Sequence, residues 1–292
     1  MDTGVIELGR YGLWCGQFRG RDTEAAAVAA REAEALGYGT LWVPGGAGGE
    51  IFEIMGRLLD GTTTMVAATG IVNVWAHTPA EVATAHAALT AAHPGRFLCG
   101  LGISHSIMVE SLGQTYDRPL GRLAEYLDEL DRADPPQPPT ERVLAALGSK
   151  MLELAKERSA GAHPYLTTPE HTAFARSVLG PDKVLAPEQK VVLTDSPTMA
   201  RGIARQALSI YLGLPNYTNN LRRYGFTDKD LAPPGSDRLV DAVVAWGEPG
   251  AVAERVARHH EAGADHVCVQ VLTEEPRRFP VEEWRILAPL LV

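Results

Sequence analysis

Residues 22–43 read DTEAAAVAAREAEALGYGTLWV, and this stretch decides how the fold is interpreted. Asp22 and Thr23 are typical helix-capping residues, and the alanine-rich segment after them predicts a helix. Gly37 suits the positive φ angle at which many helices end. The apolar run Thr40–Val43 then predicts a β-strand. The stretch is therefore one helix-to-strand unit.

The same pattern recurs along the chain. Near the carboxyl end, a helical pattern over 254–262 stops at Gly263, and a strand-like run follows over 266–272. Strands that alternate with helices predict βαβ units and a parallel sheet. We expect roughly eight strands, near residues 5–14, 39–43, 66–74, 97–102, 142–147, 160–165, 190–194 and 266–272. This count predicts an α/β fold, a single (β/α)8 TIM barrel over residues 1–292.

Two stretches interrupt the pattern. Residues 134–139 read DPPQPP and predict a rigid, extended linker before the fifth strand, because adjacent prolines cannot continue a helix. Residues from about 214 to 247 predict a helical insertion between the seventh and eighth strands. Such an insertion either covers the mouth of the barrel or packs against the outer helices or a second subunit. The sequence leaves these alternatives open.

The composition excludes several classes of protein. Of the 292 residues, 45% are hydrophobic, so a sizeable core can form. The net charge is -9 and basic residues do not cluster, which argues against a nucleic-acid partner. The amino terminus lacks a leader pattern, and the longest weakly polar run is too short to span a bilayer. We expect no membrane partner and a cytoplasmic location, in which Cys15, Cys99 and Cys268 are reduced, buried thiols.

The carboxyl ends of barrel strands carry the active site, so the residues there are the first candidates. Gly70, Gly100 and Gly102 stand at the ends of strands three and four, where glycine either permits a flat ligand to approach or relieves crowding. Gly148-Ser149-Lys150 opens a helix after strand five, where backbone N–H groups, a hydroxyl and a cation suit a phosphate. Alternatively, Lys150 is simply solvated.

Histidine and tyrosine follow strand six. His163 and Tyr165 share one strand face and His171 lies near the next helix, so both ligand-binding and structural roles stay open. The nine histidines form no metal-binding helix motif, and there is no Gly-x-Ser-x-Gly nucleophile elbow. The hydrolase and metalloenzyme hypotheses therefore lack their key parts, and we expect no metal site.

Taken together, four stretches resemble the luciferase-like, coenzyme F420-dependent oxidoreductases. They are TGIVNVW at 69–75, GRFLCGLGISH at 95–105, LAALGSKM at 144–151 and GAHPY at 161–165. The resemblance implies an enzyme in which a deazaflavin or flavin ring lies at the strand ends. A bulge in strand three backs that ring and contains a non-prolyl cis peptide, here Gly70–Ile71. It also implies a small-molecule substrate and a homodimer.

The resemblance also implies a cofactor cradle. Asn73 would sit beside the ring, and Ser104 and His105 near its edge or the substrate. The phosphate-bearing tail would lie among residues after strands five and six: Gly148, Ser149, Lys150, Met151, Gly161, Ala162 and His163.

The chemistry that this family implies is hydride transfer between the coenzyme F420 ring and a small organic substrate, with a protein group to handle the substrate proton. Some relatives carry a histidine or an acidic residue after strand two, where this chain has the glycine-rich stretch 43–50. His105 is therefore the preferred proton-handling residue, followed by Glu50 and His77. One alternative is a monooxygenase that uses reduced FMN. The other is a cofactor-binding barrel without catalytic activity.

Overall fold

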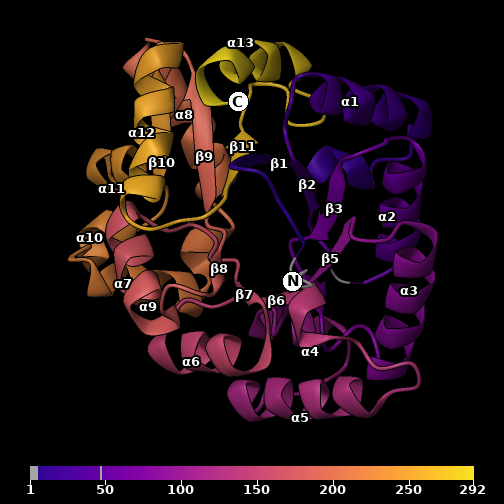
Figure 1. Cartoon of the computed structure of the whole chain (residues 1–292). Coiled ribbons are helices and arrows are strands. Elements are labelled where there is room, and N and C mark those ends of the chain that lie inside the picture. The colour runs from indigo at the N-terminus through magenta and orange to yellow at the C-terminus, as the bar shows by residue number, and fades with distance from the viewer. Residues whose placement is uncertain (1–5, 47) are drawn as a thin grey trace.

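The strands form a closed ring in the computed structural model, which describes residues 6–46 and 48–292. Parallel pairing runs in sequence order through β1, β2, β3, β5, β6, β7 and β8. β9 pairs with β11, and β11 pairs with β1. Only Ala186 and Pro187 separate β8 from β9, so the ring closes through these two residues (Figure 1). The (β/α)8 barrel expected from the sequence is confirmed.

The ring strands are β1 (Tyr11–Trp14), β2 (Thr40–Val43), β3 (Val66–Thr69), β5 (Phe97–Gly102), β6 (Arg142–Leu144), β7 (Gly161–Ala162), β8 (Val184–Leu185), β9 (Glu188–Leu193) and β11 (Val267–Val271). Strand three is interrupted after Thr69 and continues as β4 (Val72–Asn73), which pairs with β5. The expected first strand is shorter than predicted, because pairing begins at Tyr11; Val5 lies outside the described residues.

Helices alternate with the strands as predicted: α1 (Thr23–Ala35), α2 (Ile51–Asp60), α3 (Pro79–Ala92), α4 (Ser106–Ser111), α5 (Pro119–Arg132), α6 (Ser149–Arg158), α7 (Pro169–Leu179), α8 (Pro197–Leu208), α12 (Pro249–Glu261) and α13 (Val281–Leu291). The Asp22 carboxylate accepts a hydrogen bond from the Ala25 amide and caps α1. Gly37 follows α1 with φ 90°, as expected for a residue that ends a helix.

The insertion contains three helices, α9 (Pro215–Arg223), α10 (Asp228–Leu231) and α11 (Asp237–Val243). Its last four residues form β10 (Val244–Gly247), so the prediction of helix up to 247 was wrong there. The run Val-Ala-Trp-Gly gains parallel hydrogen bonds with β9, and this pairing overrides the helical pattern. Leu221 and Leu239 pack in one apolar cluster with Leu166 and Val192, which fixes the insertion to the barrel.

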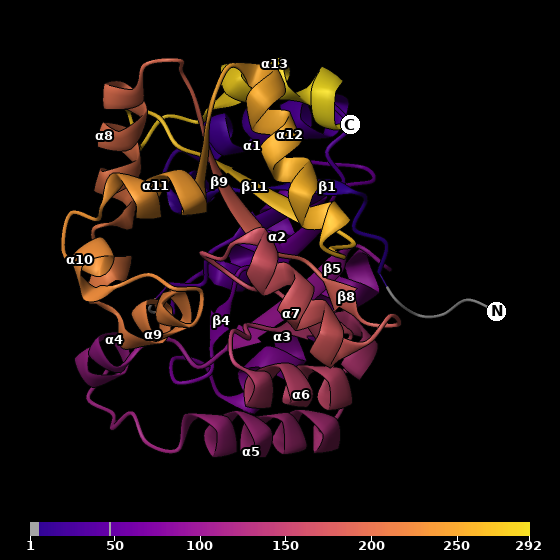
Figure 2. The same ribbon diagram turned by 90° about the vertical axis from the view of Figure 1, so that its left-hand side faces the viewer.

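Apolar side chains cover both faces of the sheet, filling the barrel on the inside and packing against the helices on the outside. Trp42 and Leu98 belong to the inner cluster, whereas Leu41 and Phe97 pack outward beneath the helices. Alternation along each strand produces the two layers. Figure 2 shows α4, α9 and α10 together on one side of the barrel. In the described part of the chain, no helix combines the length and apolar character needed to cross a membrane.

Candidate active site

A cavity of about 480 Å³ lies at the carboxyl ends of the strands, beneath the insertion. Its wall residues follow the ring strands or belong to the insertion: Trp14, Pro44, Gly46, Gly70, Ile71, Ile103, Ser104, His105, Ile107, Met108, Ala145, Ala146, Leu147, Gly148, Met151, His163, Tyr165, Ile210, Tyr211, Gly213, Leu214, Asn216 and Tyr217. Among described residues, no Asp, Glu, Lys or Arg lines it. Leu214, Asn216 and Tyr217 of the insertion cover the mouth, whereas its helix α11 packs against the outer helix α8, so each of these two expectations holds for part of the insertion.

Glycine shapes the floor of the cavity. The Gly70–Ile71 peptide is cis, as the family resemblance implied. A Cβ atom on Gly70 would lie 2.7 Å from Trp14 Nε1 and 3.2 Å from His163 Nε2. Gly100 and Gly102 have a different role, because Cβ atoms there would collide with the Thr69 carbonyl and the Ile71 side chain. Gly70 lines the cavity, whereas Gly100 and Gly102 do not line it and relieve crowding between strands.

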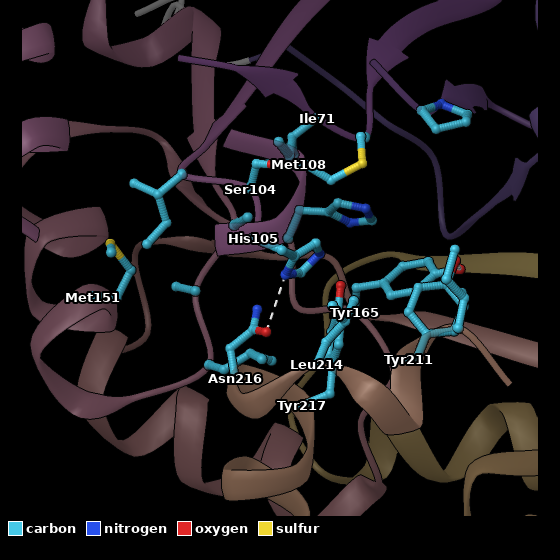
Figure 3. Close-up of a pocket in the computed structure, with 18 of the residues that line it drawn as sticks. Ile71, Ser104, His105, Met108, Met151, Tyr165, Tyr211, Leu214, Asn216 and Tyr217 are labelled. Carbon is cyan, nitrogen blue, oxygen red and sulfur yellow. Dashed lines mark hydrogen bonds between the residues drawn. The ribbon is translucent and has the colours of Figure 1, made fainter. Parts of the chain in front are cut away.

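His105 stands in the wall, at the start of α4. Its Nδ1 lies 3.0 Å from Asn216 Oδ1, and its ring packs on Tyr217 with 5.2 Å between centroids (Figure 3). An amide oxygen only accepts hydrogen bonds, so Nδ1 carries the proton and Nε2 has the free lone pair. Burial lowers the pKa of His105, and the hydrogen bond to Asn216 partly offsets this effect. The ring is therefore neutral at neutral pH.

Tyrosines form the opposite wall. The Tyr165 hydroxyl lies 2.9 Å from the Tyr211 hydroxyl and donates to Gln270 Oε1, also at 2.9 Å. Behind them, Lys190 Nζ lies 3.8 Å from the Tyr165 ring centroid and 3.1 Å from both Glu188 carboxylate oxygens. Burial lowers the pKa of Lys190 and raises that of Glu188, while each partner favours the charged form of the other. The buried ion pair holds the tyrosine wall in place.

His163 lies at the floor and is only 2% exposed. Its Nδ1 lies 2.7 Å from the Ala186 carbonyl oxygen, so Nδ1 carries the proton. The ring stacks on Trp42 with 4.2 Å between centroids. Burial lowers the pKa of His163 to about 4, and this histidine is therefore neutral. Within the described structure, His163 Nε2 and Trp14 Nε1 are buried without a hydrogen-bond partner.

Positive charge lies at one end of the cavity. Gly148 precedes α6, and a Cβ atom on Gly148 would lie 3.3 Å from Arg223 Nη1. The first amides of a helix have no carbonyl one turn earlier to bond, so they present N–H groups to an anion. His171 Nε2 lies 2.9 Å from the Leu147 carbonyl oxygen and holds the loop that leads to this helix. This end can accept a phosphate.

The sequence profile of the luciferase-like monooxygenase family matches residues 10–266. The chain belongs to this family. The assignment confirms the family expected from the four sequence stretches and places the chain among the luciferase-like oxidoreductases. No curated protein matches the chain in sequence.

Solved structures share the luciferase-like fold over almost the whole chain. An F420-dependent secondary alcohol dehydrogenase, in complex with an F420–acetone adduct, is 16% identical, with a TM-score of 0.74 over 97% of this chain and 99% of that one. The coenzyme F420-dependent tetrahydromethanopterin reductase from Methanopyrus kandleri is 14% identical, with a TM-score of 0.72 and coverage of 98% and 97%. The FMN-bound oxygenating constituent of 3,6-diketocamphane monooxygenase from Pseudomonas putida is 14% identical, with a TM-score of 0.70 and coverage of 97% on both sides.

The luciferase-like cavity brings together several residues that the sequence singled out, namely Gly70, Ile71, Ser104, His105, Gly148, Met151 and His163. Other predicted cofactor residues do not line it. Asn73 is buried and accepts a hydrogen bond from the Trp75 amide, and Gly161 and Ala162 lie within β7. Ser149 and Lys150 are exposed beyond Gly148.

Two candidate proton-handling residues lie outside the cavity. Glu50 is exposed in the turn before α2, and His77 packs edge-on against Phe52, with 5.5 Å between centroids. Arg19 donates hydrogen bonds to the carbonyls of Pro44 and Gly48 in the glycine-rich stretch after β2, of which Pro44 and Gly46 line the cavity. Of the three candidates, His105 alone reaches the wall of the luciferase-like site.

Sequence reasoning assigned no site role to four residues that the luciferase-like site uses: Trp14, Tyr211, Asn216 and Arg223. Trp14 had a usable signal, because it ends the first strand on the side where barrel sites lie. The other three belong to the insertion or to the segment just before it. Their place depends on how that segment folds back over the barrel, and no local pattern encodes this.

Proposed function

We propose that this luciferase-like chain is an F420-dependent oxidoreductase that transfers a hydride between the deazaflavin ring and a small organic substrate. One observation carries the proposal: a covered cavity with a glycine floor, a neutral histidine in the wall and positive charge at one end. The absence of charged side chains among the described wall residues favours a substrate that is uncharged where it enters the cavity.

The residues present fit a tricyclic ring with a phosphate-bearing tail. Gly70 and Ile71 line the cavity floor beside Trp14 and His163, and glycine in a strand suits the close approach of a flat ring. Gly148, the first amides of α6 and Arg223 suit the phosphate. Lys150 is exposed in the first turn of α6, where it suits the further negative charges of an F420 tail. When bound, the deazaflavin supplies or accepts the hydride.

The side chains of this chain then have separate tasks. His105, with its proton on Nδ1, offers Nε2 to the proton of a substrate hydroxyl. Asn216 holds the histidine ring in that orientation. Tyr165, Tyr211 and Tyr217 cover one wall and exclude water from the reacting groups.

A monooxygenase that uses reduced FMN is the second candidate, because one structural relative is a monooxygenase in complex with FMN. Anaerobic and aerobic turnover separate the two functions. For the proposed function, oxidised F420 is reduced by an alcohol from a substrate panel without oxygen, at a rate proportional to enzyme. Consumption of reduced FMN only in the presence of oxygen, with an oxygenated product, would establish the monooxygenase. Binding of F420 without turnover of any panel member would instead favour a binding protein.

A further inference from the structure

The mouth of the cavity carries apolar side chains although it faces solvent. The exposed wall residues form its rim, and they are Gly46, Ile107, Ile210, Gly213 and Asn216. Ile107 is 61% exposed and Ile210 is 67% exposed. No other large apolar side chain in the described part of the chain is as exposed as these two. The two most accessible apolar side chains thus stand at the entrance of the same cavity.

The fold does not need apolar side chains at these two positions. Neither Ile107 nor Ile210 belongs to an apolar cluster of the described core. In α4 the buried residue is Val109, and in the 3-10 helix η3 (Tyr211–Gly213), which follows Ile210, it is Leu212. A polar side chain at position 107 or 210 would therefore leave the buried contacts intact. Exposed apolar surface that does not pack within the fold, and that surrounds the entrance of a cavity, is typical of a ligand-binding site.

An apolar wall connects the rim to the proposed proton acceptor. Met108, Leu214 and Tyr217 line the same cavity as His105 and are less exposed than the two isoleucines (Figure 3). His105 immediately precedes α4, and Ile107 is the second residue of that helix, so less than one helical turn separates them along the chain. A substrate whose hydroxyl lies at His105 can therefore extend an apolar substituent along this wall to the rim.

We propose that Ile107 and Ile210 determine specificity for an alcohol with an apolar substituent long enough to reach the rim. The inference rests on the proposed function and adds the class of substrate. The alcohol gives the hydride of its carbinol C–H bond to the oxidised deazaflavin and its hydroxyl proton to His105 Nε2, which leaves the ketone. The two isoleucines pack on the far part of the substituent, so that apolar surface on both sides leaves water.

Equilibrium binding of ketones tests the proposal without turnover. A ketone and oxidised F420 both accept hydride, so they do not react with each other. The probes are 2-butanone, 2-hexanone and 2-octanone, titrated calorimetrically into the protein with and without oxidised F420. For the wild-type protein the affinity is expected to rise about fourfold per added methylene group. The same trend is expected in kcat/KM for the corresponding 2-alkanols when they reduce F420.

Variants of the rim separate a specificity role from a structural one. The double variant Ile107→Thr/Ile210→Thr keeps β-branched side chains and replaces their outer apolar atoms with hydroxyl groups. It is expected to bind 2-octanone about tenfold more weakly and 2-butanone within twofold of wild type, because only the longer chain reaches the rim. Ile107→Val/Ile210→Val keeps the rim apolar and retains most of the discrimination. Ile286→Thr is the matched control, since Ile286 is 49% exposed on α13 and does not line the cavity.

The outcomes distinguish this inference from the proposed function. Equal losses for 2-butanone and 2-octanone in the double threonine variant, or no effect of chain length in the wild-type protein, would overturn the inference and leave the proposed function intact. A change of oligomeric state in that variant, measured by sedimentation, would also overturn it, because a second copy of the chain would then cover the rim. Discrimination by chain length without reduction of F420 by any 2-alkanol would overturn the proposed function and support the rim as a specificity site.

Discussion

Gly70→Ala is the substitution that most sharply probes the cavity floor. The added Cβ would lie 2.7 Å from Trp14 Nε1 and 3.2 Å from His163 Nε2, closer than van der Waals contact allows. Neither ring can move freely, because His163 is stacked on Trp42 and bonded to Ala186. Overpacking of this kind costs about 1–3 kcal/mol. A loss of about 2–4 °C in Tm per kcal/mol gives a decrease of roughly 2–12 °C.

Ligand binding should suffer more than stability. The added methyl group must displace Trp14 or His163, which both line the cavity, so we expect F420 affinity to fall by about a hundredfold or more, or roughly 2.7 kcal/mol. The assay is fluorescence titration at a temperature well below the Tm of the variant, paired with thermal unfolding. Gly213→Ala is the matched control, since Gly213 lines the same cavity and a Cβ there meets nothing within 4 Å. F420 affinity of Gly70→Ala within about twofold of wild type would refute this account of the floor.

Three further outcomes are expected. Arg223→Gln should weaken the binding of FMN and F420 about tenfold by removing a phosphate partner, whereas the affinity for riboflavin, which lacks the phosphate, should not change. Arg222→Gln on the same helix is the control variant, and equal losses of affinity in both variants would contradict the assignment of Arg223 to the phosphate. His105→Gln should lower the turnover rate about a hundredfold and abolish the acidic limb of the pH–rate profile. Because burial lowers the pKa of His105, that limb lies at a pH below the ordinary histidine pKa. An unchanged pH–rate profile would show that His105 does not handle the substrate proton. Burial lowers the pKa of His259 to about 3 and that of His266 to about 4, so the folded state favours the neutral form of both histidines. The stability that they contribute is complete above the unfolded pKa and falls as the pH drops below about 6.5, by about 1.4 kcal/mol per pH unit for each histidine. A urea midpoint that stays constant from pH 7.5 to 5 would disprove this linkage.

Local sequence signals predicted the barrel because each helix-to-strand unit contains residues that begin and end its helix. Asp22 caps α1 and Gly37 follows α1 with a positive φ, so neighbouring residues predict both ends of this helix. β10 escaped prediction, because Val244–Gly247 follows α11 directly, without a glycine between them, and becomes a strand only by pairing with β9.

The residues of the site likewise fall into those that local sequence predicts and those that only tertiary packing brings together. Gly70, His105 and His163 stand at strand ends, where the barrel rule finds them from sequence alone. Asn216 lines the cavity and Arg223 lies beside Gly148 at its edge only because the insertion folds back across the mouth. The sequence ranks Glu50 next after His105, yet Glu50 lies in the turn before α2, outside the wall. Local pattern identifies the strand ends, whereas tertiary packing decides which neighbouring residues join them.

The central claim is that the cavity holds a deazaflavin in preference to a flavin. Titration of the purified chain with F420 and with oxidised FMN, side by side in one buffer, tests it most directly. The account predicts that F420 fluorescence shifts or is quenched to saturation and that FMN binds at least about tenfold more weakly. Tighter binding of FMN than of F420 would contradict the claim.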